Sequence, residues 1–326
     1  MLKIGVVGMG IGGGHGATVH KSGLAELTAI CDKDAQKLRW RLETYAKEIQ
    51  AHPRGYIDMD EMLTKEALDG VIISTPSGIH YQQALVAARH GVNMLIDKPL
   101  DITREHMGAI AQAVGRAGLL AGVNHGMRFE GAYWAVKQAL EAGEFGKLLA
   151  VDARLKFYRD QPYYDKGGWR ATWAMDGGGS LMNQGVHMID MLCWFAGTPR
   201  KVRGDFAALN HKIETEDWAG AVVEFDGNVR STITTTTCVF PKIDRVCFDV
   251  HGTAGSAFLS GGQVVETNIE SLKAPAAAPS SSAVLDFLDA LGHKRPPAVS
   301  IQQAARPVEL ILATYESARQ GRTIEL

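Results

Sequence analysis

Three side chains that can exchange protons or hydrogen bonds follow a run of glycines in the segment GGGSLMNQGVHMID, residues 177–190. Asn183, His187 and Asp190 are spaced four and three residues apart, so a helix would carry them along one side. Histidine has an unperturbed pKa of about 6.5, which suits a general base at neutral pH. The pattern predicts acid–base chemistry on a helix whose approach the glycines leave open to a substrate, with Asp190 fixing the tautomer of the imidazole.

Two other interpretations fit the same residues. A buried, hydrogen-bonded histidine behind a helix cap would show the same spacing, and so would the ligands of a metal ion. One histidine and one carboxylate without a further cluster of ligands make a poor zinc site, so we expect no metal.

A second group of residues, GVVGMGIGGGHG, follows an apolar run near the N-terminus and opens a helical pattern. Gly8, Gly10 and Gly13 satisfy the pattern GxGxxG, and Gly12, next to Ile11, is an alternative third glycine. Such a turn lets backbone amides and a helix N-terminus approach a pyrophosphate. These five residues are therefore candidates for binding a dinucleotide.

Asp32 ends the second apolar run, 19 residues after Gly13. An acidic side chain at this distance accepts hydrogen bonds from the adenosine ribose hydroxyls. Asp32 also precedes a helical pattern, and the role of helix N-cap is compatible with the first one. A carboxylate at the ribose repels a 2′-phosphate, which favours NAD over NADP, and the neighbouring Lys33 softens that preference.

Two further loops would reach the same cofactor, because ligands of a parallel sheet lie at the carboxyl ends of its strands. They are STPSGIH, residues 74–80, and DKPL, residues 97–100. Pro99 restrains the backbone after Lys98, so this lysine would be held at the end of a strand instead of moving freely as a solvated surface amine. The expected cofactor contacts in these loops are Ser74, Thr75, Pro76, His80, Asp97 and Lys98.

The elements that must position these groups differ between the two halves of the chain. In the first half, short aliphatic runs alternate with amphipathic helical patterns, as a doubly wound parallel sheet requires. The expected strands there are 3–8, 27–32, 70–75 and 93–97, and the expected helices include 35–50 and 80–90.

The second half has longer runs that alternate apolar and polar residues and are joined by turn signals such as Asp226-Gly227. These runs are 148–158, 201–210, 218–237 and 245–259, followed by a surface connection at 274–283 and helices at 284–291 and 302–320. We therefore expect an α/β Rossmann domain at 1–123 and an α+β domain with an open, mainly antiparallel sheet at 124–326.

Composition limits the class of partner. The chain of 326 residues has a formal net charge of −2 and scattered basic residues, which argues against nucleic acid or an anionic membrane surface as a partner. No apolar run reaches the roughly 20 residues of a membrane span, and the N-terminus is typical of a buried strand instead of a signal peptide. The four cysteines lie far apart in sequence and show no CxxC spacing, which predicts reduced thiols. We expect a cytoplasmic protein whose partner is a small molecule.

Together, the motifs resemble those of the Gfo/Idh/MocA oxidoreductases, the family of glucose-fructose oxidoreductase, inositol dehydrogenase and rhizopine-catabolism proteins. The resemblance runs almost from end to end through GVVGMGIGGG, TPSGIH, DKPL, RFEGAYWAVKQALEAGEFGKL, GGGSLMNQGVHMID, SAVLDFLDAL and YESARQGRTIEL. It implies a Rossmann domain for a nicotinamide cofactor, a C-terminal domain whose open sheet forms a homodimer or homotetramer, and a substrate between the two domains. It also implies that Lys98 is the lysine of the family's Glu-Lys-Pro motif and that His187 is its catalytic histidine.

Two positions depart from the family's pattern. Asp97 stands where glutamate is usual, which keeps the charge on a shorter side chain. Asn183 stands where many sugar and inositol dehydrogenases carry aspartate, and an amide orients a neighbouring group but cannot share its proton. The run from Trp169 to Gln184 resembles a subgroup that includes enzymes acting on sugar nucleotides and glycosides.

The sequence therefore predicts an NAD-dependent dehydrogenase acting on a secondary hydroxyl of a sugar, glycoside, sugar nucleotide or cyclitol. His187 would be the general base, Lys98 would hydrogen-bond the reacting oxygen, and Asn183 would orient the reacting groups. Other expected substrate contacts, suited to stacking on a sugar ring or binding its hydroxyls, are Arg128, Tyr158, Tyr163, Trp169, Arg170 and Asp176. The alternatives are a glycoside hydrolase of the same fold that recycles its NAD, and a non-enzymatic NAD or sugar sensor.

Overall fold

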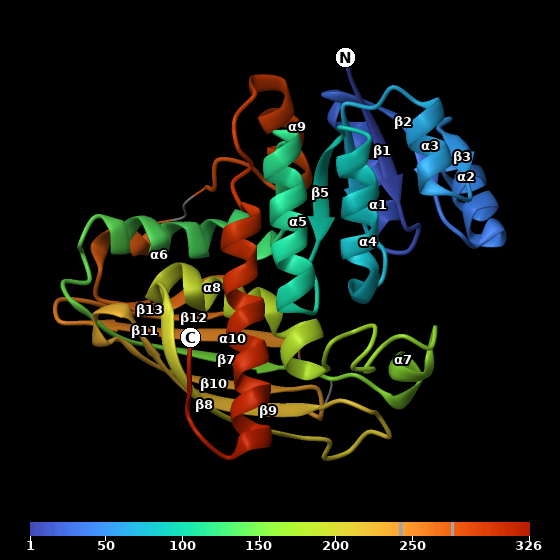
Figure 1. The fold of residues 1–326 in the computed structure, drawn as a ribbon. Coiled ribbons are helices and arrows are strands. Elements are labelled where there is room, and N and C mark those ends of the chain that lie inside the picture. The colour runs from blue at the N-terminus through green and yellow to red at the C-terminus, as the bar shows by residue number, and fades with distance from the viewer. Residues whose placement is uncertain (241–243, 275–276) are drawn as a thin grey trace. The chain divides into compact units, whose positions relative to one another are not determined.

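The computed structural model of the chain describes residues 1–240, 244–274 and 277–326, and it divides into two compact units (Figure 1). The first unit comprises Met1–His125 and Ser280–Ala304, and the second comprises Gly126–Pro279 and Ala305–Leu326. Two residues of the expected surface connection, 275 and 276, lie outside the described part. No helix in the described ranges has both the length and the apolar character needed to cross a membrane.

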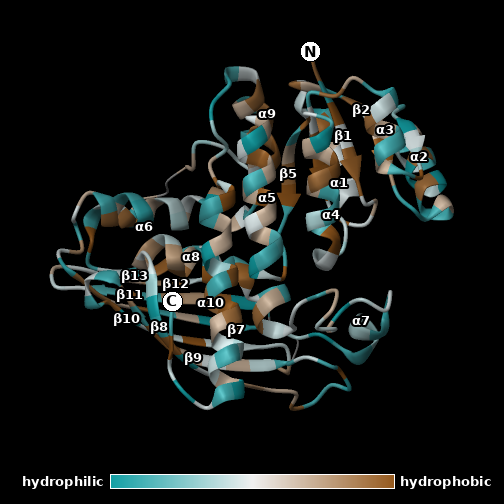
Figure 2. Cartoon of the chain, in the orientation of Figure 1, coloured by the Kyte–Doolittle hydropathy of each residue, from teal (hydrophilic) through white to brown (hydrophobic). Residues whose placement is uncertain are grey.

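The first unit is built on six strands in the order β3-β2-β1-β4-β5-β6, and all neighbouring strands pair in parallel. The strands are β1 Leu2–Val7, β2 Ala25–Cys31, β3 Arg54–Tyr56, β4 Gly70–Ile73, β5 Asn93–Asp97 and β6 Ala121–Asn124. Every residue of β4 is buried, and the apolar residues of β1 and β5 form brown strands in Figure 2. The prediction of a Rossmann sheet is confirmed.

The helices of this unit alternate with its strands. They are α1 Gly12–Ser22, α2 Ala35–Glu48, α3 Met59–Lys65, η1 Ser77–Ile79, α4 His80–Arg89, α5 Arg104–Ala117 and, from later in the chain, α9 Ala283–His293. α2 begins after Asp34, whose side chain accepts hydrogen bonds from the backbone N–H groups of Gln36 and Lys37. The N-cap of α2 is therefore Asp34, and the alternative role of Asp32 as this cap is wrong.

The segment Ser280–Ala304 joins the first unit although it comes late in the chain. A Cβ atom on Gly70 of β4 would lie 2.9 Å from Leu291 and 3.0 Å from Phe287, both of α9, so the helix packs directly on the strand. The sequence-based division at 123/124 assigned this segment to the second domain. Its apolar face instead covers the parallel sheet.

The second unit is built on eight strands in the order β13-β12-β11-β7-β10-β9-β8-β14. They are β7 Leu148–Lys156, β8 Pro199–Ala207, β9 Trp218–Phe225, β10 Arg230–Thr236, β11 Arg245–Gly252, β12 Ser256–Ser260, β13 Gln263–Thr267 and β14 Ile324–Glu325. Neighbouring strands pair antiparallel, except that β10 and β7 are parallel. The prediction of a mainly antiparallel sheet is confirmed.

Helices cover one face of this sheet (Figure 1). The helical segments of this unit are η2 Gly126–Phe129, α6 Gly131–Glu141, α7 Gln161–Asp165, η3 Ser180–Gln184, α8 Val186–Ala196, η4 Asp226–Asn228, η5 Glu270–Lys273 and α10 Ile301–Gln320, which begins in the first unit. Ala153 of β7 is fully buried on the covered face, whereas Val222 of β9, on the other face, is 55% exposed. This alternation leaves one face of the sheet open, as the sequence pattern predicts.

Candidate active site

The loop between β1 and α1 has the shape of a phosphate-binding turn. Gly8 has a φ of +91°, and a Cβ atom on it would lie 2.3 Å from the carbonyl oxygen of Ser74, so only glycine fits. A Cβ atom on Gly10 would meet nothing within 4 Å, so the loop is open on that side. Ile11 is exposed, and Gly12 and Gly13 begin α1, whose first turn has no acidic residue. The N–H groups of this turn therefore suit an anion.

Asp32 follows β2 and is 5% exposed. Its Oδ2 accepts a hydrogen bond from the backbone N–H of Met9 at 2.8 Å, and its Oδ1 accepts one from the N–H of Asp34 at 2.9 Å. Lys37 Nζ lies 3.3 Å from Oδ2, while Lys33 is exposed. The carboxylate is thus fixed against the glycine loop with Lys37, which the sequence analysis did not single out, as its ionic partner.

His80 joins the loops that follow β4 and β5. It is 1% exposed, and its Nδ1 and Nε2 lie 2.8 and 2.9 Å from the carbonyl oxygens of Pro99 and Thr75. Both ring nitrogens are taken up by the backbone, so His80 contributes to a cofactor site by holding these two loops together. Within the described residues, the Thr75 hydroxyl is buried and has no hydrogen-bond partner, which leaves it able to bind a ligand. Ser74 and Pro76 flank it.

Asp97, the last residue of β5, is the centre of a buried polar cluster. His15 Nε2 lies 3.0 Å from its Oδ1, and Asn124 Nδ2 donates to the same oxygen at 2.8 Å. Burial raises the pKa of Asp97, but the hydrogen bond and charge of His15 outweigh it and lower this pKa to about 2. Burial likewise disfavours protonated His15, yet Asp97 raises the pKa of His15 above its usual value. Lys98 follows this cluster, half-buried and ahead of a cis peptide bond.

In the second unit, Asn183 lies in η3 and His187 is the second residue of α8. Asn183 Nδ2 donates to Asp176 Oδ1, and Asn183 Oδ1 accepts from Gln184 Nε2 at 2.8 Å. Asp176 is 1% exposed, and its other carboxylate oxygen accepts from the backbone N–H of Ala171 at 2.8 Å. Asp176, expected to contact substrate, is therefore a support that fixes the orientation of the Asn183 amide. His187 is half-buried.

Arg128 is also engaged inside the protein. It lies in η2, is 6% exposed, and binds Asp190 of α8 with two hydrogen bonds, Nε to Oδ2 and Nη2 to Oδ1, each 2.7 Å long. Its guanidinium carbon lies 5.2 Å from the ring centroid of Trp194. The structure thus gives Arg128 the role of joining η2 to α8, in place of the substrate contact expected from sequence, and Asp190 holds this arginine.

Aromatic and cationic side chains gather on the segment between β7 and η3. The guanidinium carbon of Arg170 lies 4.9 Å from the ring centroid of Tyr163 and 4.7 Å from that of Trp169. The Tyr163 hydroxyl accepts from Gln184 Nε2 at 2.9 Å, and Gln184 in turn donates to Asn183. Stacked rings and a guanidinium connected in this way to Asn183 suit the faces and hydroxyls of a sugar.

Tyr158 lies in the same segment, just after β7. Its ring is edge-on to that of Phe240, with the centroids 6.2 Å apart.

Several supports of the site were missed from sequence. No role was assigned from sequence to His15, Asn124 or Gln184. Arg41 of α2 lies over the glycine loop, where its Nη2 donates to the Met9 carbonyl at 3.3 Å. Apart from Gln184, which donates to its neighbour Asn183, each acts through a partner far along the chain, such as His15 and Asp97, which are 82 residues apart, so spacing gave no signal for them.

One group of three side chains with suitable metal-ligand atoms occurs in the described part of the chain, and it consists of His211, Asp217 and Cys238. Its atoms are already hydrogen-bonded: His211 Nδ1 lies 2.9 Å from Asp217 Oδ2, and His211 Nε2 lies 2.9 Å from the carbonyl oxygen of Arg159. The group braces the loop before β9.

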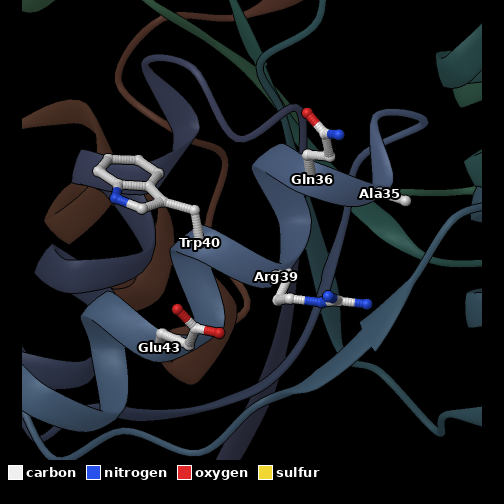
Figure 3. A pocket seen from close by; sticks show the side chains of 5 residues that line it. All are labelled: Ala35, Gln36, Arg39, Trp40 and Glu43. Atoms are coloured by element: carbon white, nitrogen blue, oxygen red, sulfur yellow. The ribbon is translucent and has the colours of Figure 1, made fainter.

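A surface pocket is lined by none of these residues. Figure 3 shows its lining side chains, Ala35, Gln36, Arg39, Trp40 and Glu43, which all come from the exposed side of α2. None of them is a candidate site residue.

Two family models match the chain. Residues 2–125 match the model described as an oxidoreductase family with an NAD-binding Rossmann fold, and residues 133–258 match the GFO/IDH/MocA C-terminal domain. The first match includes the glycine loop and Lys98, and the second includes Asn183 and His187.

Named relatives and solved structures resemble the chain over most of its length. D-apiose dehydrogenase of Paraburkholderia graminis is 27% identical over 93% of this chain and 83% of its own. The scyllo-inositol 2-dehydrogenase (NAD⁺) of Bacillus subtilis is 27% identical over 79% of this chain and 73% of its own. The WlbA dehydrogenase of Chromobacterium violaceum, solved with NADH and UDP-GlcNAcA, is 26% identical with a TM-score of 0.89, and the match covers 100% of this chain and 96% of that one.

Proposed function

Since the chain belongs to the Gfo/Idh/MocA family of oxidoreductases and binds NAD, we propose that it oxidises a secondary hydroxyl of a sugar, glycoside, sugar nucleotide or cyclitol. The observation that carries this proposal is the joint placement of Asn183 and His187 on η3 and α8, connected through Gln184 to the ring of Tyr163. The relatives named for D-apiose and scyllo-inositol, and the one solved with UDP-GlcNAcA, support this substrate range.

The residues of the first unit fit NAD. The open side of Gly10 and the N-terminus of α1 would hold the pyrophosphate, and Asp32 would accept hydrogen bonds from the adenosine ribose. The buried Thr75 hydroxyl, which has no partner among the described residues, would bind the cofactor at the end of β4. A carboxylate at the ribose favours NAD over NADP.

NAD, when bound, supplies the two-electron acceptor for the carbinol carbon. His187 takes the hydroxyl proton on a ring nitrogen and passes it to solvent; the alcohol would become a ketone as the carbinol carbon gives up its hydride to the bound acceptor. Lys98 donates a hydrogen bond to the reacting oxygen, which stabilises the negative charge that develops as the O–H bond breaks. Asn183, whose amide is fixed by Asp176 and Gln184, orients the hydroxyl towards His187. Arg170, Tyr163, Trp169 and Tyr158 contact the rest of the substrate.

The test is NADH formation by the purified protein with NAD and a panel of cyclitols, aldoses, glycosides and sugar nucleotides. Loss of a general base or of an oxyanion donor costs about 100-fold or more, so Lys98→Met and His187→Ala should each lower kcat/KM by at least that factor. The dissociation constant of NAD should change by less than about threefold in both. Lys65→Met and His90→Ala, at surface ion pairs with Glu61 and Asp60, are the matched controls.

Full activity in either site variant would refute the assigned role of that residue. Glycoside cleavage without net NADH would replace oxidation by hydrolysis with a recycled cofactor. Binding of NAD with no turnover on any substrate class would favour a sensor.

A further inference from the structure

A buried carboxyl group lies against the turn that precedes the candidate catalytic residues. Glu216 comes just before β9 and is 0% exposed. Its Oε2 accepts from the backbone N–H of Gly179 at 2.9 Å, and its Oε1 accepts from that of Leu181 at 2.8 Å. Its own carbonyl oxygen accepts from the N–H of Ser180, between them, at 2.9 Å. One residue thus binds three consecutive N–H groups of the turn.

Tyr315 of α10 completes this arrangement. Its hydroxyl donates to Glu216 Oε1 at 2.9 Å, and its oxygen receives the backbone N–H of Met182. The N–H groups from Gly179 to Met182 therefore all end on Glu216 or Tyr315. The first N–H groups of a helical segment have no partner within it, and in a buried position each would be costly if left unpaired.

The glycine run is shaped to these two residues. A Cβ atom on Gly179 would lie less than 2 Å from the Glu216 carbonyl oxygen, and one on Gly178 would lie 2.2 Å from the Tyr315 hydroxyl. All three glycines at 177–179 are buried. The sequence interpretation, in which bare glycines admit a substrate, is therefore corrected at Gly178 and Gly179: the missing side chains make room for Glu216 and Tyr315.

We propose that Glu216 is a positioning residue that holds the turn 179–182 and thereby places Asn183 and His187 for proton transfer. Its effect on catalysis rests on the proposed dehydrogenase function, whereas its hold on the turn does not. Asn183 follows the turn by one residue, and its backbone N–H bonds back to the carbonyl oxygen of Gly179 at 3.0 Å. A displacement of the turn would therefore also displace Asn183 and the start of α8.

The hydrogen-bond donors around Glu216 favour its ionised form, whereas burial favours its protonated form. Two backbone N–H groups and the Tyr315 hydroxyl donate to its side chain, so a proton on either oxygen would displace one donor. Burial without an ion-pair partner among the described residues raises the pKa of Glu216 to about 7 despite these bonds. Opening of the turn would return this carboxyl group to its ordinary pKa of 4.5, so the closed turn should lose protection as the pH rises from about 4.5 to about 7.

The other charged groups nearby are accounted for. Asp217, next in the chain, is bound by His211, and Asp176 is close enough to Tyr315 to raise the pKa of its hydroxyl, after the larger effects of burial and Glu216. The guanidinium of Arg319 lies 5.9 Å from the ring centroid of Tyr315.

The first experiment measures hydrogen exchange in the peptide covering residues 177–187, with no substrate present. Glu216→Gln keeps the shape but turns an amide NH₂ towards a backbone N–H, and we expect the turn amides to exchange about tenfold faster, the effect of one lost hydrogen bond. In the wild type, protection corrected for intrinsic exchange should fall as the pH rises from about 4.5 to about 7, and in Glu216→Gln this pH dependence should be absent. Unchanged exchange in Glu216→Gln would overturn the proposal.

The second experiment measures turnover. Glu216→Gln should lower kcat by about 10- to 100-fold with NAD affinity within about twofold, because the turn belongs to the unit that carries His187 and not to the Rossmann unit. Glu66→Gln is the matched control: Glu66 is 7% exposed, is bound by Arg54 and a tyrosine hydroxyl, and lies far from the turn in sequence. Its kcat and its turn exchange should match the wild type.

Tyr315→Phe keeps the proposal testable if Glu216→Gln does not fold. It removes one donor to the carboxylate, so the pH at which turn protection is lost should rise. An unmoved midpoint would contradict the role of the carboxylate. Faster exchange with unchanged kcat would refute positioning, whereas faster exchange in a protein that oxidises no substrate would instead refute the proposed function.

Discussion

At the scale of single residues, we expect Asp32 and Lys37 to have opposite effects on the choice between NAD and NADP. Asp32→Ala should remove hydrogen bonds to the ribose hydroxyls, each worth about 1.5–3 kcal/mol with a charged acceptor, and weaken NAD binding by tenfold or more. NADP should lose much less, because the carboxylate that repels its 2′-phosphate is gone. The measurement is the pair of dissociation constants by calorimetry.

Lys37→Ala is the complementary change at the same ion pair. It leaves the carboxylate in place and removes a cation 3.3 Å from it, so NADP should weaken while NAD changes little. If the ratio of the two dissociation constants stays constant in both variants, the ribose of the cofactor is bound elsewhere.

How far sequence predicts the site depends on the distance between partners. The candidates Lys98, Asn183 and His187 lie in contiguous motifs, and the structure places them at the end of β5 and at the start of α8 as local pattern suggests. The partners of other residues cannot be read in this way: Arg128 and Asp190 are 62 residues apart, and Glu216 lies 35 residues from Leu181. These pairs depend on which side chains are buried and on the direction in which they point, and both are set only once the sheets have formed.

At the scale of elements, the pair of His15 and Asp97 fastens α1 to β5. The pKa of His15 is raised above 6.5, so its contribution to stability is complete below pH 6.5 and is lost as the pH rises through the folded-state pKa. The pKa of Asp97 is lowered to about 2, so its contribution is present above pH 3.8 and is lost as the pH falls towards 2.

We therefore expect His15→Ala to lower the free energy of unfolding by about 1–3 kcal/mol at pH 6 and by less at pH 9. Denaturant unfolding at the two pH values checks this. His293→Ala, at an exposed pair with Asp289, is the control and should show no pH-dependent difference. If His15→Ala lowered the free energy of unfolding equally at both pH values, protonation of His15 would contribute nothing to stability.

Elements were predicted well where the pattern is long. The strand expected at 93–97 has the bounds of β5, and the helices expected at 35–50 and 302–320 correspond to α2 and α10. The strands β3, β6 and β14, of two to four residues, were missed because so short a run shows no periodicity. They exist because neighbouring strands or turns pair with them.

At the scale of the whole molecule, α9 is part of the Rossmann unit. It buries Phe287, Leu288 and Val284 almost completely, and each such side chain is worth about 1.5–3 kcal/mol. Their sum is comparable with the roughly 5–15 kcal/mol stability of a domain. We expect the fragment 1–125 to lack cooperative thermal unfolding, and the same fragment joined by a Gly/Ser linker to residues 280–304 to regain it.

Circular dichroism during heating distinguishes the two fragments. A fragment 1–125 that melts cooperatively at the temperature of the joined version would show that the helix is dispensable.

The return of the chain at Ser280 also bears on how such a protein can evolve. Gly122 of β6 forms a β-bridge with Ser300, and the backbone N–H of Val123 donates to the carbonyl oxygen of Val299 at 3.1 Å. The segment Ser280–Ala304 therefore pairs with the edge strand of the parallel sheet. The nucleotide-binding half is consequently not one uninterrupted stretch of gene. A single recombination event near the codon for His125 would transfer the six strands but not α9, so the sheet would be covered by the α9 of the other protein. Exchange of a complete cofactor domain between such genes therefore needs two more breakpoints, one on either side of α9.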